Sequence, residues 1–233
     1  MKFIPIPYIK IFIIIAFSLN TTLFAQKVHT VRKLPIIESV SQGNCDFYVV
    51  FLTGDFGFNK FDKAIVRYLN VKKVSVVVLN TERYFWTKKN PAQLGHDLET
   101  IMTKYSGKWG KTKVVFIGYS MGAEVLPFAI NHLGEKSKIQ LLDNIFIAPS
   151  QKAIFRLKPT DYLFEEKKGT DIYGELFKMK PQRSYIICDD HVLSLCRKNL
   201  EGISDHDFLG GGHHFLHHFK LLTGLIGKRL NLD

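Results

Sequence analysis

The 233-residue sequence has few cysteines, no repeat, no low-complexity segment and no concentrated block of charge. Its N-terminal apolar run, at 11–19, has only nine residues, whereas a helix that spans a membrane needs about 20. These absences exclude solenoid, fibrous and multi-span membrane proteins. What remains is ordinary globular composition, with 46% hydrophobic and 23% charged residues, in a chain long enough for one domain with a sizeable core.

The first 25 residues differ from the rest of the chain. Lys2 and Lys10 precede the apolar run, and the small residue Ala25 follows it after a short polar stretch. This order predicts a secretory signal peptide at 1–25 and a single exported domain at 26–233. Because Leu23 stands where a small residue is expected before the cleaved bond, an uncleaved membrane anchor is the alternative.

The three cysteines, Cys45, Cys188 and Cys196, are an odd number in a chain expected in a compartment that permits disulfides. Cys188 and Cys196 are close enough in sequence to form a disulfide across one loop. The alternative is that they are buried free thiols. None of the three lies in a context that favours a catalytic thiolate.

Acidic residues are outnumbered, and the formal net charge is +11. The lysines and arginines are dispersed, whereas a nucleic-acid-binding protein concentrates them in one stripe, so no specific nucleic-acid partner is expected. For an exported chain, the anionic face of a membrane or an acidic polymer is the expected partner. A basic surface that faces only solvent is the alternative.

Buried strands alternate with amphipathic helices along the chain. Apolar runs predict strands at 47–53, 74–80, 113–118, 144–149 and 184–188, and helical spacing predicts helices near 58–69, 91–105, 125–133 and 215–226. Strands that are apolar on both faces, with helices between them, predict an α/β fold with a mostly parallel sheet covered on both faces. The mixed segment 151–182 interrupts the pattern and is either a small cap or a surface excursion.

A serine lies between two glycines at the end of the third predicted strand. Ser120 follows the apolar run 113–117, a helix is expected at once, and Gly118 and Gly122 flank it in a G-x-S-x-G pattern. In an α/β hydrolase the nucleophile occupies such a strained turn, and glycines there avoid clashes with the neighbouring strand and helix. The position of Ser120 in the expected fold therefore predicts a nucleophile.

Histidines that could serve as its base lie in LGGGHHFLHHF, before the last predicted helix. A serine hydroxyl needs a base to become nucleophilic, and in this fold the histidine comes last along the chain. We expect His213 to be the base, with His214 as the alternate. A metal site is a competing hypothesis, since His213 and His217, or His214 and His218, have i, i+4 spacing.

Aspartates that could orient this base follow the strand predicted at 184–188. Asp189 and Asp190 come directly after it, where the acid of such a triad belongs. We expect Asp190, the residue further into the loop, with Asp189 as the alternate and Asp205 and Asp207 as further candidates.

Backbone N–H groups near Ser120 can form an oxyanion hole, which stabilises the negative charge of a tetrahedral intermediate. Met121 follows the serine and supplies one donor. Gly54 and Gly57 give the loop after the first predicted strand room to approach, so that Asp55 or Phe56 supplies the second. This chemistry needs no cofactor and no metal.

Four segments resemble one known family. The chain is similar over about 45–225 to the bacterial virulence protein VirJ and to the C-terminal domain of its relative AcvB, in TGDFGF, RYFWTKKNP, GGGHHF and, most specifically, IGYSMGAEVLPF. The resemblance implies an α/β-hydrolase fold, a periplasmic location, Ser120 as nucleophile and a base in GGGHHF. The chain departs from the family pattern at IICDDH, where the acid is expected.

Two functions follow from the resemblance. The AcvB branch is associated with hydrolysis of lysyl-phosphatidylglycerol, which implies a serine esterase acting on an aminoacyl ester of an anionic membrane lipid. The VirJ branch is associated with type IV secretion, which implies a binding component that contacts secretion-system proteins without catalysis. Arg83, Tyr84 and Trp86, in RYFW, suit a boundary between acyl chains and anionic headgroups and are expected substrate contacts. The alternative is a core aromatic cluster.

Overall fold

The computed structural model describes residues 33–157, 169–179 and 183–232. The chain divides into two units, Met1–Lys33 and Leu34–Asp233, and the fold described below is that of the second. The predicted signal peptide at 1–25 lies outside the described residues. Among the described residues, no helix is long and apolar enough to cross a membrane.

Seven strands form the main sheet, in the order β1-β3-β2-β4-β5-β8-β9. They are β1 (Ile36–Ser39), β2 (Phe47–Leu52), β3 (Val76–Leu79), β4 (Lys113–Tyr119), β5 (Leu141–Ile147), β8 (Tyr185–Cys188) and β9 (Asp205–Phe208). All neighbours are parallel except β1, which pairs antiparallel with β3. The predicted mostly parallel α/β sheet is confirmed.

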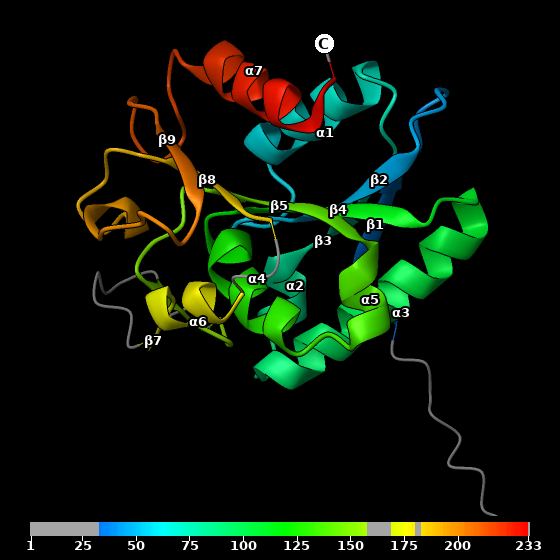
Figure 1. Cartoon of the computed structure of the whole chain (residues 1–233), viewed down its shortest axis with the longest axis horizontal. Coiled ribbons are helices and arrows are strands. Elements are labelled where there is room, and N and C mark those ends of the chain that lie inside the picture. Colours follow the sequence, from blue (N-terminus) through cyan, green and yellow to red (C-terminus); the bar gives the residue numbers. More distant parts are fainter. Residues whose placement is uncertain (1–32, 158–168, 180–182, 233) are drawn as a thin grey trace, which may run out of the picture. The chain divides into compact units, whose positions relative to one another are not determined.

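Helices cover both faces of this sheet (Figure 1). Helices α1 (Lys60–Val71) and α7 (Phe219–Leu230) lie on one face, and α2 (Thr81–Phe85), α3 (Pro91–Trp109), α4 (Met121–Asn131) and α5 (Glu135–Gln140) on the other. Strand β2 shows why both faces are covered: its successive side chains point to opposite faces of the sheet, and those on both faces are apolar. Val49 packs in the core beneath α1 and α7, whereas Val50 packs in the core beneath α3 and α4.

The segment 151–182 interrupts the strand–helix alternation as expected, and its residues 158–168 and 180–182 lie outside the described part. Strand β6 (Lys152–Ala153) pairs antiparallel with β7 (Thr170–Asp171), and α6 (Tyr173–Lys178) follows. The amide of Asn131, at the end of α4, donates a hydrogen bond to the backbone oxygen of Glu175 in α6 (3.0 Å). The described parts of the insertion therefore pack on α4, the helix that follows Ser120.

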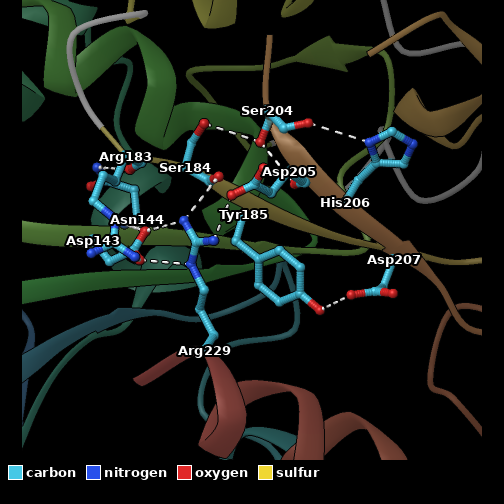
Figure 2. A network of polar contacts seen from close by, with 10 residues as sticks. All are labelled: Asp143, Asn144, Arg183, Ser184, Tyr185, Ser204, Asp205, His206, Asp207 and Arg229. Carbon is cyan, nitrogen blue, oxygen red and sulfur yellow. Dashed lines mark hydrogen bonds and ion pairs between the residues drawn. The ribbon is translucent and has the colours of Figure 1, made fainter. Parts of the chain in front are cut away.

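One arginine ties the last helix to the sheet (Figure 2). Arg229 of α7 donates through Nε to Asp143 on β5 (2.7 Å), through Nη1 to Asp205 on β9 (2.6 Å) and through Nη2 to the backbone oxygen of Ser184 (3.3 Å). The side chain of Asp143 is 2% exposed, so its charge depends on this partner. Because α7 follows the GGGHHF segment, this anchor also fixes one end of the histidine loop.

We expect Arg229→Met to lower the free energy of unfolding by about 3 kcal/mol, because it removes the main partner of a buried charge. Arg183→Met is the matched control, since Arg183 lies 3.5 Å from the same carboxylate but its side chain is 64% exposed. Its effect should stay below about 1 kcal/mol. Urea unfolding measures both, and equal losses in the two variants would contradict the anchoring role.

Candidate active site

Ser120 occupies a strained turn between β4 and α4. Its backbone dihedrals are φ 50° and ψ −119°, a combination that non-glycine residues adopt only where the surroundings enforce it. The surroundings here are close backbones. A Cβ on Gly122 would lie 2.3 Å from the backbone oxygen of Leu52, and one on Gly118 would lie 2.5 Å from the backbone nitrogen of Ala123. Only glycine fits at either position, which explains the sequence pattern around the serine.

Ser120, His213 and Asp189 form a continuous hydrogen-bonded chain. His213 Nε2 lies 2.8 Å from Ser120 Oγ, and His213 Nδ1 lies 2.7 Å from Asp189 Oδ2. An ionised carboxylate can only accept, so Nδ1 carries the proton and Nε2 of the neutral ring accepts from the serine hydroxyl. Ser120 is 6% exposed, and the His213 side chain is 34% exposed. The arrangement can therefore move a proton from the serine hydroxyl to the imidazole.

The partner of His213 is Asp189, the alternate, and not Asp190 as expected. Asp189 is the first residue after β8 and is 1% exposed, so its side chain lies beneath the histidine loop. Asp190 is exposed and instead accepts from the backbone N–H groups of Gly211 (3.3 Å) and Gly212 (2.9 Å). The reason is that β8 ends at Cys188. Asp189, the first residue after the strand, therefore lies at the site, and Asp190 points away from Ser120.

Electrostatics keep the Asp189 carboxyl ionised. Burial raises its pKa, but the hydrogen bond from His213, the nearby Ser194 hydroxyl and the charges of His213 and His191 outweigh this effect. Its pKa is therefore lower than usual. An ionised Asp189 favours the imidazolium form of His213 that would arise if the serine lost its proton.

A disulfide closes the loop that carries Asp189. Cys188 and Cys196 are bonded, with Cα atoms 5.8 Å apart, which decides between the two alternatives for this pair. Cys45 is a free thiol. Closing a loop of this length stabilises the fold by about 2.5 kcal/mol, because it lowers the entropy of the unfolded chain. It also restricts the segment 188–196, which carries Asp189.

The histidine loop is also fixed by Tyr119, the residue before Ser120. Its hydroxyl donates to the backbone oxygen of His213 (3.1 Å) and lies 2.7 Å from His214 Nδ1. A phenol has one proton, so His214 Nδ1 must be the donor in the second contact. His214, the alternate base, therefore bonds Tyr119 and not Ser120. Sequence analysis missed Tyr119, because a variable position in G-x-S-x-G gives no signal of its own.

The metal hypothesis requires each pair of histidines to lie on one face of a helix, and the structure shows that they do not. Helix α7 begins at Phe219, and residues 213–218 form turns in which Phe215 and His217 have positive φ. His218 Nδ1 lies 2.7 Å from the backbone oxygen of Gly210. Within the described ranges, no three His, Cys, Asp or Glu side chains are grouped to hold a metal ion.

The expected oxyanion-hole residues lie beside the serine. Met121 is the first residue of α4, where helix N–H groups have no partner within the helix. Asp55 and Phe56 form the middle of a turn in which the Gly57 N–H donates to the Gly54 oxygen (3.1 Å). A Cβ on Gly54 would lie 3.6 Å from Ser120 Cβ, so this turn abuts Ser120.

A buried carboxyl, which sequence analysis also missed, supports that turn. Asp62 is 0% exposed and forms a capping box with Asn59, accepting from its backbone N–H (3.1 Å). Burial raises the pKa of Asp62 to about 7, although backbone N–H groups of Asn59 and Gly54 lower it. The N-x-x-D spacing at 59–62 is a signal that could have identified the cap.

The residues of RYFW divide between core and surface. Tyr84 is 3% exposed, donates to Asp97 Oδ2 (2.6 Å) and packs edge-on against Phe85. Its expected role as a substrate contact is therefore wrong, because it belongs to the core. Arg83 is exposed, and Trp86 is 60% exposed, so both are accessible to a ligand.

The sheet and the serine turn are those of an α/β hydrolase, and solved structures share the fold. Est1E from Butyrivibrio proteoclasticus matches at 12% identity and TM-score 0.60, over 84% of this chain and 92% of that one. MenH from S. aureus matches at 12% identity and TM-score 0.61, over 84% and 98%. The Pyrococcus furiosus esterase Pf2001 matches at 12% identity and TM-score 0.58, over 85% and 91%.

The family model described as bacterial virulence protein (VirJ) matches residues 46–231. The chain therefore belongs to the VirJ family, as the four sequence segments indicated. A search among curated proteins finds no match to this chain.

We expect Asp62 to make stability depend on pH. An acid whose pKa is raised by folding stabilises the fold most below about pH 4, and this contribution is lost as the pH rises toward 7. Asp62→Asn removes this titration, so the free energy of unfolding of the variant, relative to that of the wild type, should increase between pH 5 and pH 8. The gain should exceed about 1 kcal/mol, since one pKa unit corresponds to about 1.4 kcal/mol.

Urea unfolding at both pH values gives this difference. Asp46→Asn is the matched control, because Asp46 is exposed and the hydrogen bond from Lys113 lowers its pKa, which places its titration below this range. The Asp46 difference should stay flat. A flat difference for Asp62→Asn as well would contradict the raised pKa.

Proposed function

We propose that this protein is an exported serine ester hydrolase in which Ser120 is the nucleophile, His213 the general base and Asp189 the orienting acid. The observation that carries the proposal is the unbroken chain from Ser120 Oγ through both His213 nitrogens to Asp189, with contacts of 2.8 and 2.7 Å. Three side chains from distant parts of the sequence meet in the order that this chemistry needs.

In the first half of the reaction, Ser120 Oγ attacks the ester carbonyl carbon while His213 Nε2 takes the serine proton. The carbonyl oxygen becomes negative, and the N–H of Met121 together with an N–H of the Asp55–Phe56 turn stabilises it. The intermediate collapses, the bond to the alcohol oxygen breaks, and His213 gives its proton to the leaving alcohol. The acyl group remains on Ser120.

In the second half, water replaces the alcohol. His213 Nε2 takes a proton from the water as its oxygen attacks the acyl carbon, and the same N–H groups stabilise the second oxyanion. The bond to Ser120 Oγ breaks, and His213 returns the proton to the serine. Asp189 stays ionised throughout and stabilises the imidazolium in both halves.

For the substrate, we propose an ester with an accessible carbonyl, and in particular an aminoacyl ester of an anionic phospholipid such as lysyl-phosphatidylglycerol. The support is the family resemblance and the exposure of Arg83 in α2 and of Trp86 directly after it. For the location, we propose the periplasm. The Cys188–Cys196 disulfide supports it, because disulfides persist in oxidising compartments outside the cytosol.

Hydrolysis of p-nitrophenyl acetate tests the proposal with four proteins: wild type, Ser120→Ala, Asp189→Asn and Asp190→Asn. We expect Ser120→Ala to fall to background. Asp189→Asn should lower kcat by about 10³–10⁴-fold, because the amide favours the wrong histidine tautomer. Asp190→Asn removes the same charge one residue away and should cost less than about 10-fold, since it only holds the loop.

A folded Ser120→Ala protein with wild-type turnover would overturn the assignment of the nucleophile. A folded wild type that turns over neither this ester nor lysyl-phosphatidylglycerol would favour the alternative, a VirJ-like binding component of a secretion system that has the hydrolase fold without catalysis.

A further inference from the structure

Large apolar side chains are exposed on the loops at the edge of the sheet where Ser120 lies. Phe56 is 64% exposed, Trp86 60%, Val192 72%, Leu193 48% and Leu216 65%. We call these five residues the apolar rim. Side chains of this kind are favourable to bury, and exposed ones that gather around one site mark an interaction surface rather than chance.

The topology places the whole rim at one edge of the sheet. Phe56 follows β2, Trp86 follows β3 through α2, Val192 and Leu193 follow β8, and Leu216 follows β9. These strands are parallel to β4, so their carboxyl ends lie at the edge where β4 ends before Ser120.

Contacts connect the rim segments to the site itself. His191 precedes Val192 in the sequence, and its ring lies 6.2 Å from the His213 ring. The backbone N–H of Leu216 donates to the Gly211 oxygen (2.8 Å) within the histidine loop. The loops that carry Val192, Leu193 and Leu216 are therefore loops that also form the site.

The charges on these loops indicate the partner. Lys60, Arg83, Lys88, Arg197 and Lys220 are exposed on or directly after the loops that carry the rim. The acidic residues on the same loops are Asp55, which is half-buried beside Phe56, Glu82, which lies against the Gly57 turn, and Asp190, which accepts from the Gly211 and Gly212 amides. The whole chain carries +11. Exposed apolar side chains within a basic surface suit an anionic bilayer, where apolar groups enter the acyl boundary and cations meet the headgroups.

We propose that the apolar rim docks this edge of the protein, where β4 ends before Ser120, onto the headgroups of an anionic phospholipid bilayer. A lipid ester then reaches the serine without leaving the membrane. The proposal rests on the proposed function for its purpose, but the docking step itself needs no catalysis.

Co-sedimentation with vesicles tests it, using phosphatidylcholine alone or mixed with phosphatidylglycerol. The test variant is Val192→Ser with Leu193→Ser, two exposed rim positions that are neither proposed catalytic residues nor expected substrate contacts. The matched control is Val71→Ser with Ile139→Ser, which are 75% and 84% exposed. Val71 ends α1 and Ile139 precedes β5, so both lie at the opposite edge. Neither variant changes the net charge.

We expect the rim variant to bind anionic vesicles at least about 10-fold more weakly than wild type, because two apolar side chains no longer enter the bilayer. The control variant should bind like wild type, and phosphatidylcholine alone should bind weakly. All proteins share the same remaining chain, so any contribution from other segments cancels. Equal binding of the rim and control variants, or equal binding to both kinds of vesicle, would overturn the proposal.

Turnover of p-nitrophenyl acetate by the same proteins separates this proposal from the previous one. If the wild type is an active esterase but the rim variant binds vesicles as well as the control variant does, the docking proposal is refuted and the hydrolase proposal is not. A protein that binds through the rim but has no esterase activity refutes the hydrolase alone.

Discussion

The close approach of α4 to the end of β2 is the constraint on which the site depends. Gly122 brings the α4 backbone so near Leu52 that a single added carbon would lie 2.3 Å from the Leu52 oxygen. This contact forces the chain to turn sharply between β4 and α4, and Ser120 takes the strained conformation at the corner. The same turn brings the serine beside Gly54 and places Met121 at the start of a helix, where its N–H points out of the helical hydrogen-bonding pattern.

The C-terminal third of the chain brings the base to that corner through several independent restraints. The Cys188–Cys196 disulfide holds the segment that carries the acid, and Asp190 binds the glycine amides before His213. Tyr119 holds the His213 carbonyl from the serine side. Arg229 anchors the helix that follows the loop, through a buried carboxylate on β5. A site assembled in this way is preorganised, so that in the proposed reaction the proton acceptor is in position without reorganisation.

Most of the fold could be predicted because buried strands and amphipathic helices have strong periodic signals. Strands β2 to β5 and β8 were expected from apolar runs, whereas β1 and β9 were missed, since DHDF on β9 is exposed along its whole length. Phe215 was expected to begin the last helix. It is buried but lies in the turns before α7, where backbone conformation at the glycines decides the path.

The residues of the site could be predicted where a sequence motif fixes the backbone. They could not be predicted where their positions depend on the exact end of a strand or on tertiary packing. Ser120, Gly118 and Gly122 follow from one pattern. The choice of Asp189 over Asp190 depends on where β8 ends, and the burial of Tyr84 depends on packing by α3, neither of which the sequence states. The signal peptide at 1–25 remains a prediction.

The measurement that tests the central claim most directly is reaction of the protein with a fluorophosphonate, followed by intact mass and peptide mapping. The account predicts one adduct per chain on Ser120, lost in His213→Gln. An adduct elsewhere, or labelling of Ser120 that does not depend on His213, would contradict it.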